Sequence, residues 1–253
     1  MKNLTYILPI IENNSEFLNR CFKSLSFEDG EILYIVGPSN IIDKVDTSVC
    51  GENASVVLIE NNENTDYITQ INEGVKRCET AYFSIIQFDD IYSPTWFKHV
   101  ETHMKYFEDV SVFLPLIELM SDKTKRVVAL SNELSWSSSY VNELGFIDND
   151  ALLSFYDFNI YGGVFKTSDF TESGYLKPSL KIASTYELLL RYCELGKKIY
   201  VIPKIGYTHT IERDDSYSMV LSKNITKEEG EWLIKTAQEE KYFKQDRNKT
   251  YSK

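Results

Sequence analysis

Short apolar runs alternate with segments of helical hydrophobic spacing over the first hundred residues of the chain. The apolar runs are typical of buried strands and cover four segments: Tyr6–Ile11, Glu31–Val36, Val56–Ile59 and Tyr82–Phe88. Between them, apolar positions recur every three or four residues after Asn14 or Ser15, after Asp66, and after Ser93 with its following Pro94, all suited to helix starts. Strands and helices alternating at this rhythm predict right-handed crossovers and a mostly parallel sheet.

The second half of the chain is less regular. Four segments carry strand or helix signals: a strand at Val110–Ile117, a strand at Gly162–Phe165, a helix at Ser184–Leu195 ended by Gly196, and a strand at Lys198–Ile202 ended by Pro203. Pro115 should confine its strand to a sheet edge or a bulge. The polar stretch Ser121–Asp150 predicts loops with one hairpin.

A helical extension is expected at the carboxyl terminus. Thr226 and Glu229 form a capping box, and the helix that it opens should continue to about Lys241. The charged segment Lys244–Lys253 should be frayed. The fold class is therefore α/β, with a mostly parallel central sheet flanked by helices and followed by this extension.

Composition excludes several classes of protein. The 253 residues are 43% hydrophobic and 26% charged, as in ordinary globular proteins, and the net charge of −11 disfavours binding to nucleic-acid backbones. No run approaches 18 apolar residues, so no transmembrane segment is expected, and the amino terminus lacks the pattern of a signal peptide. The four cysteines show no C-x-x-C spacing. Free thiols and a cytoplasmic location are expected.

Polar residues follow four of the predicted strands. They are Glu12, Gly37 to Ser39, Glu60 to Asn64, and the pair Asp89 and Asp90. Parallel sheets bind ligands beyond the carboxyl ends of their strands, so these residues should line one site.

At these residues the chain resembles the family 2-type nucleotide-sugar glycosyltransferases, which have the GT-A fold. The resemblance rests on Asn72-Glu-Gly74-Val75, Cys78-Glu-Thr80-Ala-Tyr82, Gln87-Phe-Asp89-Asp90 and Pro94, with Tyr6–Pro9 and Asn64 adding to it. It covers residues 4 to about 107 and reappears around 160–216. It implies a nucleotide-sugar-binding half over residues 1–110, an acceptor-binding half over 111–216, and a helix and tail over 217–253.

The resemblance implies a Mn²⁺ or Mg²⁺ site at the acidic pair. The cation would neutralise the charge that builds on the leaving nucleoside diphosphate. Asp89 and His209 are the expected ligands, and Asp90 is expected to act beside them as a catalytic residue. Gln87 stands where the family usually has an acid, which predicts looser metal binding.

The expected donor is a nucleotide diphosphate sugar, most simply a UDP-linked one. Its candidate binding residues are Pro9, Glu12, Gly37, Ser39, Asn64, Asn72, Gln87, Asp89 and Arg213. Val36 and Gly37 stand where the family has an acid that holds the nucleotide base. Recognition of the base should then fall to Glu12, Asp66 or the backbone near Ser39.

The catalytic base is the second departure from the family pattern. Ser184 and Thr185 align with the usual acidic pair. Glu187 could act from one helical turn away. It could equally form an ion pair with Arg191 on the surface. Acids on the acceptor side remain as substitutes, namely Asp148, Asp150, Asp157 and Asp169, and Trp136 is a candidate for contact with the acceptor.

Together these features predict a glycosyltransferase of the hexosyltransferase class. It would move a sugar from a nucleotide diphosphate sugar to a glycan or other hydroxyl acceptor, with a metal and with inversion. The alternative is a degenerate GT-A fold that binds carbohydrate or nucleotide. A nucleotidyltransferase is disfavoured because Glu12-Asn13-Asn14 offers no glycine-rich basic phosphate loop.

Overall fold

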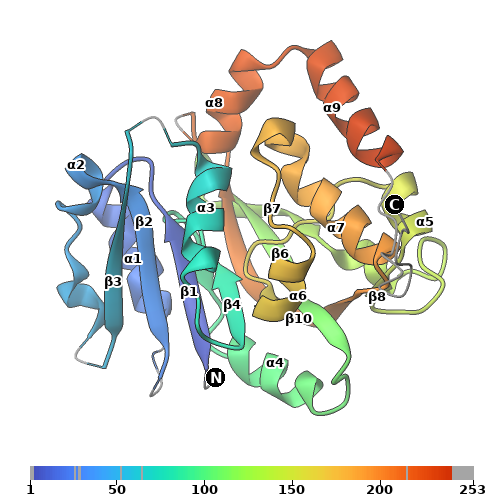
Figure 1. The fold of residues 1–253 in the computed structure, drawn as a ribbon, viewed down its shortest axis with the longest axis horizontal. Helices are drawn as coiled ribbons and strands as arrows, with labels where there is room; N and C mark the ends of the chain where they lie inside the picture. Colours follow the sequence, from blue (N-terminus) through green and yellow to red (C-terminus); the bar gives the residue numbers. More distant parts are fainter. Residues whose placement is uncertain are drawn as a thin grey trace, which may run out of the picture.

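The fold is organised around one sheet that receives strands from both halves of the chain (Figure 1). The computed structural model describes residues 3–25, 27, 30–51, 53–63, 65–214 and 216–240. Within them the sheet has ten strands, and its main path runs β3-β2-β1-β4-β9-β6-β10-β5. Asn64, Lys241 and the segment Lys244–Lys253, which carried expectations above, lie outside the described residues.

The first half of the sheet is parallel, as predicted. It consists of β1 (Leu4–Pro9), β2 (Ile32–Pro38), β3 (Ser55–Asn61) and β4 (Tyr82–Ile85). The intervening elements are α1 (Ser15–Ser24), α2 (Ser39–Ile42), the short 3-10 helix η1 (Thr47–Cys50) and α3 (Tyr67–Lys76). Asn14 and Asp66 cap α1 and α3 through their side chains. The alternation of apolar runs and capped helices was therefore a correct guide to this half.

Antiparallel strands complete the other half of the sheet. They involve β5 (Ile91–Tyr92), β6 (Val110–Ser121), β7 (Arg126–Ser131), β8 (Phe146–Ile147), β9 (Val164–Lys166) and β10 (Lys198–Ile211). β9 runs antiparallel to both β4 and β6, whereas β6 and β10 are parallel to each other. A hairpin joins β6 to β7, so only its second strand lies inside the stretch Ser121–Asp150 where a hairpin was predicted.

Two prolines behave differently from each other in this half. Pro115 lies inside β6, where the pairing with β10 shifts register between Val201 and Ile205, so the expected irregularity is present within a strand that has neighbours on both sides. Pro203 does not end its strand, because β10 continues through the shifted register to Ile211. That continuation is what carries His209 to the strand-end side of the sheet.

The remaining helices are α4 (Trp96–Met104), α5 (Asn149–Ser154), α6 (Thr167–Glu172), α7 (Ser184–Glu194), α8 (Tyr217–Asn224) and α9 (Lys227–Glu239), with the 3-10 helices η2 (Glu133–Trp136) and η3 (Pro178–Ala183). Gly196 follows α7 with a positive φ of 71°, and Thr226 caps α9 as predicted. The prediction that Ser93 caps α4 was wrong, since the helix begins at Trp96 and Thr95 precedes it without a side-chain cap.

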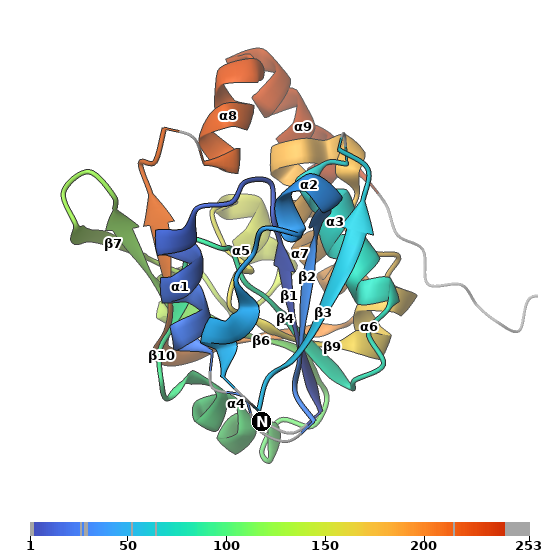
Figure 2. The same cartoon turned by 90° about the vertical axis from the view of Figure 1, so that its left-hand side faces the viewer.

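The central strands β1, β2 and β4 are buried on both faces, whereas the outer strands β3 and β7 are largely exposed. Ile7 and Val36 pack with α3 on one face, while Tyr6, Leu8 and Ile35 pack with α1 and α4 on the other. Figure 2 shows these helices on opposite sides of the strands. Burial on both faces explains why the strands read as continuous apolar runs. Among the described helices, none has the length and apolar character to cross a membrane.

Candidate donor and acceptor site

The predicted strand-end site forms at the carboxyl edge of β1 to β4. These strands are parallel, so the segments that follow them meet at one edge, and α8 lies on that side of the molecule (Figure 1). The carboxyl end of β10 reaches the same place. It brings His209 and Arg213, more than a hundred residues away in sequence, to the acidic pair.

The acidic pair sits in a turn that its neighbours hold in place. β4 ends at Ile85, three residues earlier than predicted, and the chain then turns through Asp89 and Asp90. The backbone oxygen of Asp89 accepts hydrogen bonds from Arg20 at 3.2 Å and from the hydroxyl of Thr210 at 2.7 Å. Because of this turn, Asp90 does not point away from the site as strand alternation would have required.

Asp90 orients His209. Its Oδ2 lies 2.8 Å from His209 Nδ1, and its Oδ1 accepts the backbone N–H of Thr210 at 2.7 Å. Burial lowers the pKa of His209, but the charge and hydrogen bond of Asp90 outweigh it and hold that pKa above its ordinary value. The ring of Tyr161 stacks on the imidazole at 5.7 Å between centroids. A carboxylate that binds one imidazole nitrogen leaves the other directed toward a ligand.

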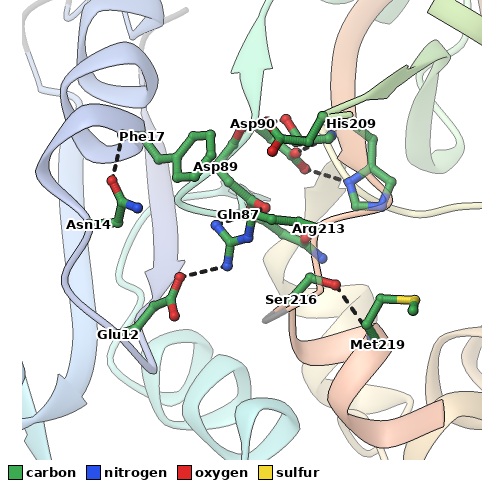
Figure 3. Close-up of polar contacts among 12 residues, drawn as sticks. Glu12, Asn14, Phe17, Gln87, Asp89, Asp90, His209, Arg213, Ser216 and Met219 are labelled. Atoms are coloured by element: carbon green, nitrogen blue, oxygen red, sulfur yellow. Dashed lines mark hydrogen bonds and ion pairs between the residues drawn. The ribbon is translucent and has the colours of Figure 1, made fainter. Parts of the chain in front are cut away.

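Arg213 is the cation of the site (Figure 3). Its Nη2 lies 2.6 Å from Glu12 Oε1, and its Nη1 lies 3.3 Å from Asp89 Oδ2. The guanidinium also lies 4.9 Å from the ring centroid of Phe17 and 4.7 Å from that of Phe88. This stacking supports a buried positive charge between two carboxylates.

Asp89 is almost fully enclosed. Only 3% of the residue is exposed. Burial raises the pKa of its carboxyl to about 7 and Asp90 adds to the effect, while Arg213 and His209 act in the opposite direction. The cavity beside it, which Gln87, Arg213 and Ser216 also line, measures about 10 Å³. That space is smaller than a diphosphate, so this arrangement of Arg213 is a closed one.

The donor atoms present fit a metal that is shared with a substrate. Among the described residues, no group of three or more His, Cys, Asp and Glu side chains is placed to hold a metal ion. Asp89 and His209 provide two potential ligands, and Mg²⁺ commonly takes one or two protein ligands, with phosphates and water completing its shell. The residues therefore fit a cation bound together with a diphosphate, and they do not fit a protein-only metal site.

The predicted donor-binding residues do not all lie at this site. Asn72 is a correction, because its side-chain amide bonds both the N–H and the oxygen of Leu176, at 3.0 and 2.8 Å, and so joins α3 to the segment before η3. Asp66 caps α3 by binding the backbone N–H and the hydroxyl of Thr69. Asn64, also predicted here, is outside the described residues.

Pro9, Gly37 and Ser39 lie at the strand ends as expected. Pro9 and Gly37 are buried, and a Cβ on Gly37 would lie 2.6 Å from the oxygen of Ile10, so this position requires glycine for packing. Ser39 lines a separate open cavity of about 470 Å³ with Glu60 and Asn61. That cavity is the larger hollow at this edge of the sheet.

Glu187 is not placed to act as a catalytic base. It is fully buried, and its Oε2 lies 2.8 Å from Arg191 Nη2 while its Oε1 lies 3.1 Å from Lys177 Nζ. A carboxylate shielded from solvent and held by two cations cannot receive a proton from an incoming acceptor. The assignment as base is therefore corrected, and the ion pair with Arg191 is present in the interior rather than on the surface.

A third cavity is linked to His209 through the ring of Tyr161. It measures about 230 Å³ and lies between the segment 156–161, the start of α7 and α9; its walls include Asp157, Tyr161, Thr185 and Ile234. Tyr161 belongs both to this wall and to the stack on His209. Sequence reasoning missed Tyr161 and Thr210, since nothing in their local sequence signals a role. Trp136, predicted to contact the acceptor, does not line this cavity; it packs on Tyr200 and donates to the oxygen of Val201.

Comparison with known proteins supports the fold. No family model matches the chain, and no curated protein matches it in sequence. The solved structure of S. aureus TarS residues 1–349 matches with a TM-score of 0.59 and 14% identity over 92% of this chain and 69% of that one. The same protein in complex with UDP gives 0.56 and 16%, and in complex with UDP-GlcNAc 0.58 and 14%, each over 92% of this chain and 70% of that one.

The chain therefore has the α/β fold of a GT-A-type glycosyltransferase, the type to which TarS belongs. The fold class expected from the sequence is confirmed.

Proposed function

We propose that the protein is a glycosyltransferase that moves a sugar from a nucleotide diphosphate sugar, UDP-linked, to a hydroxyl acceptor. The observation that carries the proposal is the meeting of Asp89, Asp90, His209 and Arg213 at the strand-end edge of a GT-A fold. The UDP and UDP-GlcNAc complexes of the structural neighbour TarS support a uridine nucleotide as the donor.

We assign the residues at this edge different contacts with the donor. Asp89 and His209 would hold a Mn²⁺ or Mg²⁺ ion with the donor's phosphates, with Asp90 fixing the imidazole. Such a cation stabilises the charge of the leaving diphosphate. Arg213 can bind diphosphate oxygens with two of its N–H groups once it releases Glu12 or Asp89. Inversion at the sugar carbon is part of the proposal, as the mechanism typical of the resembling family.

Donor entry requires a rearrangement. The cavity of about 10 Å³ at Asp89 cannot admit a diphosphate while Arg213 spans Glu12 and Asp89. Replacing those two carboxylates by phosphate oxygens would keep the charge on Arg213 paired. The cost of opening is therefore offset by equivalent contacts with the donor.

Calorimetry with UDP, with and without Mn²⁺, tests the proposal. Metal-dependent binding that disappears in Asp89→Asn, together with release of UDP from UDP-sugars by the unaltered chain, is the expected result. Glu79→Gln, which changes a carboxylate outside the site, is the matched control and should bind as the unaltered chain does.

The closed cavity at Asp89 favours one competing function, a GT-A fold that has lost catalysis and only binds carbohydrate or nucleotide. Binding of UDP that is indifferent to Mn²⁺, with no turnover of any UDP-sugar, would establish that alternative.

A further inference from the structure

The acceptor side of the proposed site has a cavity but no base from the position that the sequence suggested. Ser184 is buried, Thr185 carries a hydroxyl, and Glu187 is held by Arg191 and Lys177 in the interior. If the chain transfers sugars, another group must take the acceptor proton. The cavity of about 230 Å³ is the candidate place for such a group, because Tyr161 forms part of its wall and the ring of Tyr161 also stacks on His209.

One carboxylate lines this cavity. Among the described residues that form its walls, Asp157 is the sole acid, and none is a lysine or an arginine. The other acids considered on this side are engaged or lie outside the cavity: Asp148 caps α5 and binds Asn142, Asp169 binds Lys197, and Asp150, in α5, is not part of the cavity wall. Asp157 thus has the location that the others lack.

The backbone around Asp157 is held in place by Asn132. The Nδ2 of Asn132 donates to the oxygens of Asn159 and Pro115, each at 2.9 Å, and its Oδ1 accepts the N–H of Asn159 at 2.8 Å. The side chain of Asn159 in turn accepts the N–H of Tyr161 at 2.9 Å. This chain of hydrogen bonds fixes the segment that carries both Asp157 and Tyr161, which is how a catalytic group is kept in position.

The carboxylate of Asp157 has no structural hydrogen bond or ion pair among the described residues. Within the described part of the chain, no hydrogen bond or ion pair involves its side-chain oxygens, and the contact recorded for the residue is its backbone oxygen with Ser131 Oγ at 3.4 Å. Asp157 is an exposed residue on this wall, and the partial burial of its carboxyl raises the pKa of the group, with no charged neighbour contributing. A carboxylate with a raised pKa is a better proton acceptor than a fully solvated one.

Resting on the function proposed above, we propose that Asp157 is the catalytic base and that the cavity beside it binds the acceptor as an uncharged sugar or similar polyol. The absence of cationic side chains from the described walls favours a neutral acceptor over a phosphorylated one. The rings of Tyr156 and Tyr186, 6.4 Å apart, offer the apolar faces on which sugars commonly pack.

The acceptor O–H gives its proton to an Asp157 carboxylate oxygen while the acceptor oxygen forms a bond to the anomeric carbon. The bond from that carbon to the phosphate oxygen breaks, and its electron pair leaves with the nucleoside diphosphate. In the absence of an acceptor, water can take the same place, which yields free sugar and the diphosphate.

The experiment compares Asp157→Asn with Asp150→Asn, an exposed acid of the same half that lies outside the cavity. Release of UDP from UDP-GlcNAc, UDP-glucose and UDP-galactose is measured with water as acceptor, and UDP affinity with Mn²⁺ is measured by calorimetry. The expected result is a loss of turnover of at least about a hundredfold in Asp157→Asn. Its UDP affinity should stay within about threefold, because the change removes a base and leaves the donor contacts intact. Asp150→Asn should match the unaltered chain.

The failures are distinguishable. If Asp157→Asn turns over within threefold of the unaltered chain, the assignment of the base is overturned while the transferase function stands. If the unaltered chain binds UDP but turns over none of the three donors, transfer and base are both overturned and donor binding remains. If it does not bind UDP, the proposed function itself fails.

Discussion

Replacing Glu187 by glutamine tests whether this residue stabilises the fold or performs catalysis. Its carboxylate is fully buried between Arg191, whose side chain is 3% exposed, and Lys177, whose side chain is 30% exposed. The amide would remove one negative charge and leave the Arg191 guanidinium buried beside a neutral group.

The magnitude follows from that burial. Breaking a buried ion pair by removing one partner costs about 3–5 kcal/mol. In a protein of this size each kcal/mol lowers Tm by about 2–4 °C. The melting temperature of Glu187→Gln should therefore fall by about 6–20 °C.

Urea unfolding followed by circular dichroism measures the effect, and an unchanged m value shows that the compactness of the two states is unaltered. Glu239→Gln is the matched control. It breaks the i,i+4 pair of Glu239 with Lys235, whose side chains are 68% and 71% exposed, and should cost about 0–1 kcal/mol. If Glu187→Gln unfolds like the control while losing turnover with donor binding intact, the reasoning is refuted and Glu187 is restored as a base.

Three further predictions follow from local geometry. Gly162→Ala should cost about 2–6 kcal/mol of unfolding free energy, because φ is +72° and the new Cβ would lie 2.5 Å from Tyr207 Cδ2. Gly51→Ala is the control, because its φ is +84° and the space around it is open, so it measures the conformational cost alone. Equal losses for the two variants in urea titrations would contradict the steric account. Burial raises the pKa of Cys50 to about 11. Alkylation of Cys50 at pH 8, followed by peptide mass spectrometry, should therefore be about two orders of magnitude slower in the folded chain than in urea. The alkylation rate in the folded chain should increase about tenfold per pH unit. Because the pKa of Cys50 is higher in the folded chain than in the unfolded chain, its titration should lower the free energy of unfolding as pH rises above about 8.5. An alkylation rate that does not change with pH would exclude this pKa shift. Arg213→Met should lower Tm in EDTA, because it removes the guanidinium that pairs with Glu12 and Asp89. Mn²⁺ should raise the Tm of this variant more than the Tm of the unaltered chain. Equal increases in Tm would show that Arg213 and the metal do not share a site.

The sequence by itself determined the parallel half of the fold. Apolar runs such as Tyr6–Ile11 and caps such as Asn14 and Asp66 are local signals, because they can be read from neighbouring residues. The strand-end rule then placed Glu12 and Asp89 at one edge, since parallel connection fixes which ends meet.

Only the tertiary structure decided which polar groups are paired with which. The bond between Asp90 and His209 spans 119 residues, and it required β10 to continue past Pro203, which the local sequence argued against. Asn72 matched a motif position and Glu187 lay one helical turn from one, yet the side chain of Asn72 binds the backbone of Leu176 and that of Glu187 is paired with Arg191. Hydrogen bonds and ion pairs depend on distances of a few ångströms between segments remote in sequence, and those distances are set by packing.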